Sequence, residues 1–202
     1  MRRFAALAVI ALIAGAMLWG CSDPEDDDSP NDLSCPLRTS PDSLLAQLVW
    51  AYEHEDVDVY LDCLADSFTF FLCEDDWQSD PTLPHFWRLS EEETIHSNMF
   101  GEAGDVDSIY LALETLSVDT VSVPDGRGVG WEYEEDVDLR VYIGQTVYLA
   151  GDETAFTIRV DPDDVGPNGE TLYEVWEWRD LEWTGRAATE QTSWGSIKAF
   201  FR

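Results

Sequence analysis

Basic residues are scarce in this chain, in which 11 Lys and Arg stand against 42 Asp and Glu, a formal charge of −31 at neutral pH. Nucleic acid is therefore not expected as a partner, because binding it depends on Lys and Arg that displace counterions from phosphates. The excess of acidic residues has three possible explanations: solubility, a saline habitat or the capture of divalent cations. Composition alone favours solubility or a saline habitat.

Cysteine is equally rare, and the four positions are Cys21, Cys35, Cys63 and Cys73. No CxxC pair or Cys/His cluster has the spacing of a zinc site, so the sequence predicts no metal site. If Cys21 is lipidated, as its context below indicates, at most one disulfide can form among the other three in an oxidising compartment. We expect Cys35 to pair with Cys63 or Cys73, which would fix the start of the folded domain.

Motifs for common catalytic and cofactor chemistry are missing as well. No phosphate-binding loop, dinucleotide fingerprint or Ser-His-Asp arrangement can be recognised, so no cofactor is predicted. The segment Asp161-Pro162-Asp163 begins like a calcium loop. However, Val165 stands at its fifth position and Leu172 at the twelfth, where a glutamate is required, so we predict a long hairpin loop instead.

The chain has one long apolar run, Phe4 to Leu18, directly after Met1-Arg2-Arg3. It is too short to span a bilayer of about 30 Å as a stable helix, and it has the make-up of a signal peptide over residues 1–20. Its end, Leu18-Trp19-Gly20-Cys21, resembles the lipobox of bacterial lipoproteins. That resemblance implies a lipid on Cys21 and anchoring in the bacterial cell envelope, at the outer membrane or periplasmic face. The alternative is an ordinary secretory signal followed by a chance cysteine.

Residues 21–39 follow as a predicted flexible tether. They include the run Glu25-Asp26-Asp27-Asp28 and almost no apolar side chains, a composition that cannot bury enough surface to repay ordering. The rest, residues 40–202, has the length of a single domain with a substantial core.

Two short helices are predicted to open this domain. Ser40, Pro41 and Asp42 form a helix start, and Asp56 can cap a second helix. Apolar residues recur at helical spacing after both starts: Leu44, Leu45, Leu48, Val49 and Tyr52, then Val57, Tyr60, Leu61 and Leu64. A strand with Phe68, Phe70 and Leu72 follows, then a loop over residues 74–88 and a third helix from a capping box of Ser90 and Glu93 to Gly101.

From Asp107 onward, apolar residues occur at every second position in several runs, as is typical of β-strands. The alternating runs are Ile109, Leu111 and Leu113; Val137, Leu139, Val141 and Ile143; Phe156, Ile158 and Val160; and a last strand over residues 171–181. Gly151-Asp152 and Asn168-Gly169 are hairpin turn signals. Residues 192–202 can form a closing helix with Trp194, Ile197 and Phe201 on one side.

This order of elements resembles the nuclear-transport-factor-2-like fold, also called SnoaL-like or cystatin-like. The resemblance is closest over residues 44–71, and residues 176–180 with 193–198 are similar to the end of uncharacterised bacterial lipoproteins that carry this domain. It implies an α+β fold in which N-terminal helices pack on a curved antiparallel sheet that forms a cone.

Enzymes of this superfamily place an Asp or Glu base in the mouth of the cone, sometimes with His and Tyr. The resemblance therefore makes His96, Asp66, Tyr133 and Tyr173 candidate pocket residues, since a dry pocket raises carboxylate pKa values. None lies in a motif that fixes its role. A helix-surface position is the simpler interpretation for His96, and a turn cap for Asp66, so no catalytic residue is predicted.

Trp176 and Trp178 are two apart on the last predicted strand and should share one face of it. They would either fill the cone as core or line a pocket for a small apolar ligand. We accordingly expect a membrane-anchored envelope lipoprotein with a non-catalytic binding or interaction domain. The alternatives are a small-molecule lyase or isomerase that uses a carboxylate or His in the cone, and a structural module that forms homodimers.

Overall fold

The computed structural model describes residues 34–101, 105–123, 128–151, 153–181 and 193–202. The signal peptide, Cys21 and the tether up to residue 33 lie outside these residues. The described residues belong to one compact unit, Ser34–Arg202. Within it, no helix is long and apolar enough to cross a membrane.

The domain is α+β, as predicted. Its helices are α1 (Pro41–Glu53), α2 (Val57–Asp62), α3 (Glu74–Ser79), α4 (Leu89–Phe100) and α5 (Trp194–Phe200). Its strands are β1 (Leu64–Phe71), β2 (Phe86–Arg88), β3 (Ser108–Ser122), β4 (Val129–Ile143), β5 (Thr146–Ala150), β6 (Glu153–Val165) and β7 (Thr171–Asp180).

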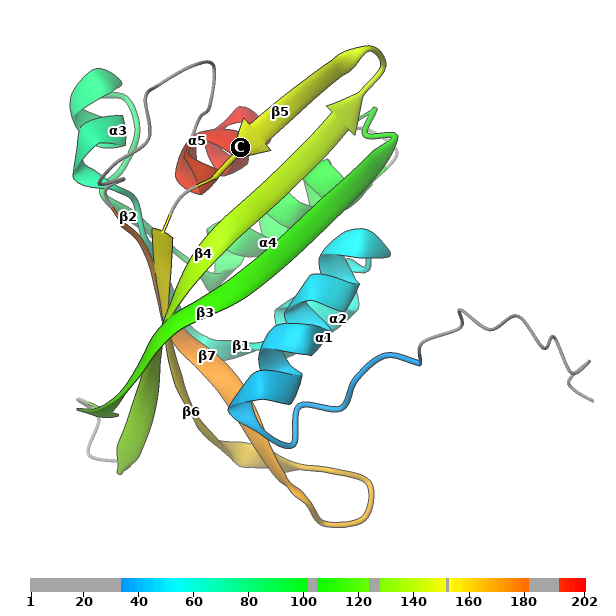
Figure 1. Ribbon diagram of the computed structural model, residues 1–202, viewed down its shortest axis with the longest axis vertical. Helices are drawn as coiled ribbons and strands as arrows, with labels where there is room; N and C mark the ends of the chain where they lie inside the picture. The colour runs from blue at the N-terminus through cyan, green and yellow to red at the C-terminus, as the bar shows by residue number, and fades with distance from the viewer. Residues whose placement is uncertain (1–33, 102–104, 124–127, 152, 182–192) are drawn as a thin grey trace, which may run out of the picture. The chain divides into compact units, whose positions relative to one another are not determined.

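All strands form one sheet in the order β2-β1-β7-β6-β4-β3, with β5 also on β4 (Figure 1). Every pair is antiparallel except β1 with β7, which is parallel. The long β4 pairs with β6 over residues 131–136 and with β5 over residues 139–143, so one strand joins both parts of the sheet.

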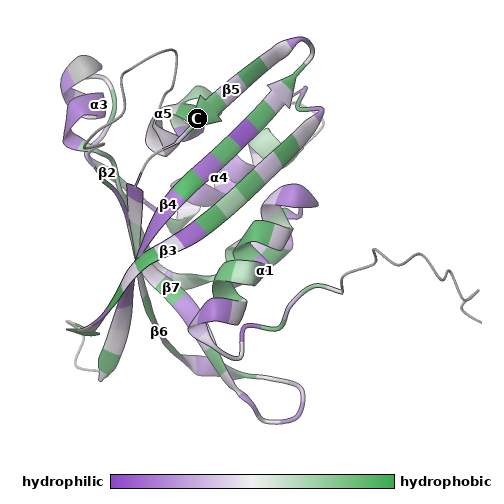
Figure 2. Cartoon of the chain, viewed as in Figure 1, coloured by the Kyte–Doolittle hydropathy of each residue, from purple (hydrophilic) through white to green (hydrophobic). Residues whose placement is uncertain are grey.

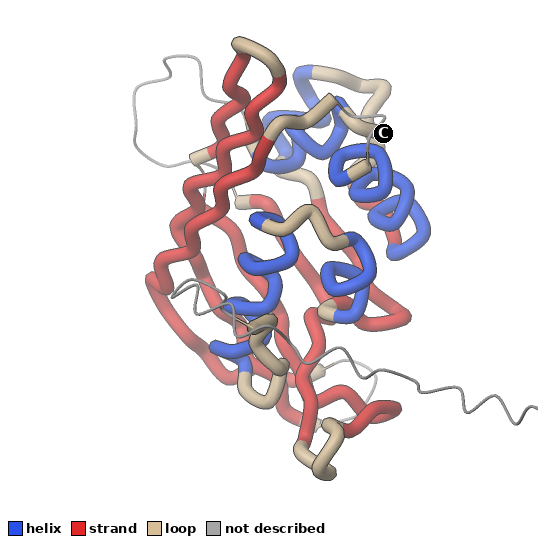
Figure 3. The backbone as a smooth tube through the Cα atoms, turned by 90° about the vertical axis from the view of Figure 1, so that its right-hand side faces the viewer, coloured by secondary structure: helices blue, strands red, loops and turns tan. Residues whose placement is uncertain are grey.

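The helices gather over one face of the sheet, as the view in Figure 3 shows. Hydropathy alternates along β3 and β4 (Figure 2), and Val137, Leu139 and Val141 of β4 are buried on the helix-covered side. We call this side the inner face. From α1, Leu44 and Leu48 pack into the same core. The α+β cone expected from the sequence is thus confirmed.

Helix starts follow the predicted local chemistry. The Ser40 hydroxyl accepts a hydrogen bond from the Ser43 backbone N–H, and the Asp56 carboxylate accepts one from Val59. Trp194, Ile197 and Phe201 are buried on one side of α5, also as predicted.

Three local predictions were wrong. The expected loop over residues 74–88 contains α3 and β2. Helix α4 begins at Leu89 with Arg88 as its N-cap residue, and the Arg88 backbone N–H donates to the Glu91 carboxylate at 2.9 Å. The predicted capping box of Ser90 and Glu93 does not form this start. Strand β5 was missed because Gly144, at φ +60, makes a tight turn that no familiar dipeptide announces.

The predicted disulfide is not present among the described cysteines. Cys35 is exposed, whereas Cys63 and Cys73 are buried and unpaired. The thiol of Cys63 donates to the Val59 carbonyl oxygen at 3.3 Å, so it has a hydrogen bond within its own segment and no disulfide. Burial raises the pKa of Cys73 to about 11, which keeps this thiol protonated.

Arg38 shows that the folded domain begins before residue 40. Its guanidinium, with 4% of the side chain exposed, donates to the carboxylates of Asp62, Asp161 and Asp164 at 2.7–3.1 Å and to the Tyr173 carbonyl oxygen. An internal arginine therefore pairs with two carboxylates, Asp161 and Asp164, of the segment that begins like a calcium loop. Among the described residues, no group of three or more His, Cys, Asp or Glu is arranged to hold a metal ion.

Candidate functional site

Two helices carry charged residues on the stripes that face the core. On α4 the stripe is Glu92, Ile95, His96 and Met99; on α5 it is Trp194, Ile197, Lys198 and Phe201. Both follow the i, i+3, i+4, i+7 spacing of one helix face, so burying the apolar members also buries the polar ones. Glu92, His96 and Lys198 are each 0% exposed.

The Glu92 carboxylate is the centre of this cluster. Oε1 lies 2.9 Å from Lys198 Nζ and also accepts the Trp87 indole N–H. Oε2 accepts the Tyr60 hydroxyl at 2.8 Å and lies 3.0 Å from His96 Nδ1. Both oxygens are therefore fully hydrogen-bonded, as a buried charge requires.

His96 continues the network toward α1 and α5. Its Nε2 lies 2.7 Å from the Tyr52 hydroxyl, and Tyr52 in turn accepts the Trp194 indole N–H at 3.2 Å. The arrangement assigns the ring proton to Nδ1, which points at Glu92, and leaves Nε2 to accept from Tyr52. The imidazole also stacks on the Tyr60 ring with centroids 3.7 Å apart.

Lys198 ends in a cage of aromatic rings. Its ammonium lies 3.8 Å from the Trp178 ring centroid and 4.1 Å from that of Phe70, and the Glu92 carboxylate completes its surroundings. Cation–π attraction is strongest where water is excluded, as here. The cage thus compensates in part for the desolvation of the ammonium.

The electrostatics of the cluster indicate one ion pair beside a neutral histidine. Burial would raise the pKa of Glu92, but Lys198 and His96 outweigh it and lower that pKa below its usual range. Burial lowers the pKa of His96 despite the nearby carboxylate, so the ring is neutral at pH 7. Burial also raises the pKa of both Tyr52 and Tyr60, with the Glu92 charge adding to the effect.

Of the residues that the sequence singled out for a pocket, two lie inside the cone, namely His96 and Trp178. The prediction that His96 lies on the helix surface is therefore wrong, because α4 directs its side chain toward Tyr52. Tyr133 lies on the inner face of β4 but away from the cluster, and its hydroxyl donates to Asp42 at 3.2 Å. Burial and the Asp42 carboxylate raise the pKa of Tyr133 to about 12.

Trp176 does not share a face with Trp178. The register with β6 shifts between Val175 and Glu177, so Trp176 is the extra residue of a β-bulge. Trp178 packs in the core against Phe156 with centroids 4.6 Å apart, whereas Trp176 is half-buried beside Arg159. A strand without the bulge would have placed both indoles together.

Asp66 and Tyr173 lie outside the cone cluster. Asp66 is exposed, in the part of β1 where the register with β7 shifts, and it lines a polar cavity of about 520 Å³ near Arg38. Tyr173 is half-buried near the start of β7, with its ring 5.7 Å from that of Trp131. Neither contributes to one site with His96.

Sequence reasoning missed Glu92, Lys198 and the two tyrosines. The signal was present, because Glu92 and Lys198 occupy stripe positions shared with Ile95 and Ile197. A charge on a stripe that must be buried predicts an internal partner of opposite sign. Which two helices would meet could not be read from spacing alone.

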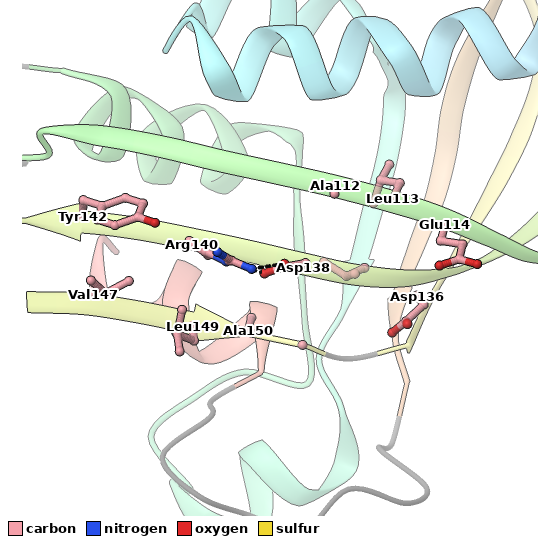
Figure 4. Close-up of a pocket in the computed structure, with 12 residues that line it drawn as sticks. Ala112, Leu113, Glu114, Asp136, Asp138, Arg140, Tyr142, Val147, Leu149 and Ala150 are labelled. Carbon is pink, nitrogen blue, oxygen red and sulfur yellow. Dashed lines mark hydrogen bonds and ion pairs between the residues drawn. The ribbon is translucent and has the colours of Figure 1, made fainter.

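The open cavities lie elsewhere on the domain. A depression of about 840 Å³ lies across β3, β4 and β5. Figure 4 shows the side chains that line it, most of them on the outer face of the sheet. Its acidic members are Glu114, Asp136 and Asp138, and Asp138 holds the guanidinium of Arg140 at 2.9 Å. Its apolar and aromatic members include Tyr142, Val147 and Leu149. Neither this depression nor the 520 Å³ cavity is lined by Glu92, His96 or Lys198.

Comparison with known proteins yields matches in structure but not in sequence. No protein-family model and no curated protein matches the chain. The β subunit of benzoate 1,2-dioxygenase from Burkholderia mallei aligns with a TM-score of 0.48 at 12% identity, over 69% of this chain and 86% of that one. A conserved protein from Planctomyces limnophilus aligns with the same score and identity, over 69% and 91%.

A third similar structure is described as an NTF2-like protein of unknown function in nutrient uptake, from Rhodospirillum rubrum. It aligns with a TM-score of 0.45 at 12% identity, over 68% of this chain and 93% of that one. Likeness at this level concerns the fold alone. By its own element order and sheet topology, the domain is an α+β cone of the nuclear-transport-factor-2-like kind.

Proposed function

We propose that this protein is an envelope-anchored binding module that does not catalyse a reaction in its cone. One observation carries the proposal: the carboxylate at the centre of the cone, Glu92, is 0% exposed and ion-paired with Lys198. A general base needs a proton to abstract within hydrogen-bond reach, and both oxygens here are already occupied. The lipobox resemblance at Cys21 supports the envelope setting.

The outer depression of Figure 4 is the surface best suited to binding. It places an apolar side chain, Val147, which is 44% exposed, near the carboxylates of Glu114 and Asp136. A partner with basic and apolar groups complements this surface. A second copy of this domain fits less well, because face-to-face pairing would bring six carboxylates together with only two Arg140 side chains, each already paired with Asp138 of its own copy.

A thermal-shift screen of small molecules and short basic peptides tests the proposal, with turnover assays on every hit. We expect binders that are not converted. Val147→Lys should weaken the binding of basic peptides, because it adds a positive charge that repels them, at an exposed position outside the core. Thr120→Lys, on an exposed stretch of β3 away from the depression, is the matched control and should bind as the wild type does.

The second candidate is an enzyme of proton transfer, and the Tyr52–His96–Glu92 chain of hydrogen bonds favours it, since these are acid and base side chains. A hit that is converted by the wild type but not by His96→Gln, with unchanged folding, would establish the enzyme. Binding without conversion, lost on Val147→Lys, would support the binding module.

A further inference from the structure

Glu135 is a second buried carboxylate, and its surroundings differ from those of Glu92. It lies on the inner face of β4, next to Tyr133 and Val137 in the alternation, and is 1% exposed. Its carboxylate accepts a hydrogen bond from a neutral donor, the Thr115 hydroxyl, at 2.7 Å. Burial raises the pKa of Glu135, and the Asp42 carboxylate adds to the effect.

Three other carboxylates, whose side chains are at most 9% exposed, each have a basic partner. Glu92 has Lys198 at 2.9 Å, Glu174 has Arg159 at 2.7 Å, and Asp161 has Arg38 at 2.7 Å. In the described ranges, no basic side chain forms an ion pair with Glu135. A chain with few basic residues leaves this carboxylate without an internal counterion, at a cost in desolvation that an external cation would relieve.

A groove of about 260 Å³ opens beside Glu135, between α1 and the strands β3 and β4. Apolar side chains form most of its wall: Leu45, Ala46, Val49 and Leu113. Its polar members are Asp42, Thr115 and Glu135. Four of these residues share one face of α1, because they are spaced at i, i+3, i+4 and i+7: Asp42, Leu45, Ala46 and Val49. This face presents a carboxylate at one end and an aliphatic surface along its length.

This combination selects a class of ligand. Two carboxylates and a hydroxyl provide fewer oxygen ligands than Ca²⁺ takes, and the aliphatic wall provides no further ligand for a metal ion. An ammonium group carries three donors for the carboxylates, and an alkyl chain can lie along Leu45, Val49 and Leu113. The groove is smaller than the roughly 300–1,000 Å³ of pockets for drug-sized molecules, so the ligand must be small.

We propose that this groove binds a small primary alkylammonium ion, with its charge at Glu135 and Asp42 and its chain against α1. The charged ends of the groove and of the outer depression are separate, because Glu135 and Asp136 point to opposite faces of β4, although Leu113 lines both cavities. The site thus goes beyond the proposed function and stands or falls independently of it.

Calorimetric titration of the intact protein with n-butylammonium chloride tests the site, with n-butanol and sodium chloride as probes that lack the charge or the chain. We expect saturable binding of n-butylammonium alone. Glu135→Gln should weaken it at least about tenfold, because it removes the charge that the ammonium meets. Asp136→Asn, the neighbour on the outer face, should bind as the wild type does.

Val49→Phe provides a second, independent variant, since it fills the groove and leaves both carboxylates in place. It should also weaken binding, even if Glu135→Gln disturbs folding. Tighter binding of Nα-acetyl-lysine amide than of n-butylammonium would support the same ammonium site and identify a protein lysine as its source. Absence of saturable binding, or binding unchanged by both Glu135→Gln and Val49→Phe, would overturn the proposal.

Discussion

A few polar residues occupy core positions of this domain at which the helix pattern would normally place apolar side chains. Glu92, His96 and Lys198 stand on helix stripes whose other members are apolar, and each finds its hydrogen bonds within the cone. Since both partners of the ion pair are desolvated, its main effect is to fix how α4 and α5 meet. Removing one partner would leave the other charged and buried.

His96 should make stability depend on pH below neutrality. Burial lowers its pKa below the ordinary 6.5, so the folded protein keeps the ring neutral while the unfolded chain takes up a proton. The stability advantage of the wild type over His96→Gln should therefore be complete above pH 6.5. It should shrink by up to about 1.4 kcal/mol per pH unit below that value.

Urea unfolding of both proteins at pH 7.5 and pH 5 measures this advantage. The comparison with His96→Gln cancels the titration of the many surface carboxylates, which both proteins share. A difference in stability that is the same at both pH values would contradict the buried neutral state of His96.

Elements of this fold differ in how far their sequence specifies them. Helices α1 and α2 were predictable to within a residue or two because Ser40 and Asp56 are strong caps ahead of apolar stripes. The strands β3, β4 and β6 were predictable because apolar residues alternate along part of each, and β7 because it follows the turn signal Asn168-Gly169. The fold class followed from their order.

The site was less predictable than the fold. The bulge at Trp176 reverses the face of one indole, and a bulge leaves no periodic signal in a single sequence. The meeting of Glu92 with Lys198 joins positions 106 residues apart, which local patterns do not encode. The short α3 and β2 were hidden because Pro81 and Pro84 made the whole segment look irregular.

Helix α5 should be sensitive to the size of residue 195. A Cβ added at Gly195 would lie 2.0 Å from Leu72 Cδ1 and 2.8 Å from Asp180 Oδ2. Gly195→Ala should therefore destabilise the domain by about 1–3 kcal/mol through overpacking, although alanine favours a helix by up to about 1 kcal/mol. Ser196→Ala on the half-exposed side of α5 is the control and should change stability little.

Chemical denaturation of the two variants and the wild type checks this prediction. Equal or higher stability of Gly195→Ala would show that α5 does not pack against Leu72 and Asp180 as described.

Charge is the dominant property of the whole molecule. Removal of residues 1–20 would take Arg2 and Arg3 with it and leave nine basic residues against 42 acidic ones, a formal charge of −33. Like charges on a compact surface repel, and the screening length falls from about 30 Å at 0.01 M salt to about 3 Å at 1 M. The melting temperature should rise with sodium chloride over this range; a flat curve would argue against surface repulsion as a major cost.

Membrane attachment, which we propose from the lipobox resemblance, also concerns the whole chain. Cys21→Ser should release the protein from the membrane fraction of the cell, because the residue at the lipobox position would no longer offer a thiol for a lipid. Fractionation of cells that express both forms, followed by immunodetection, measures this. A variant that remains in the membrane fraction with its signal removed would contradict the lipoprotein proposal.

The account depends most on the claim that Glu92 and Lys198 serve the structure of the cone. Equilibrium unfolding of Glu92→Gln, Lys198→Met and the double variant at pH 7 tests it most directly. Each single variant should lose about 3–5 kcal/mol, because it leaves one charge buried without its partner, and the double variant should lose less than the sum. A Glu92→Gln protein as stable as the wild type, or more stable, is what a carboxylate kept for chemistry would give, and it would contradict the account.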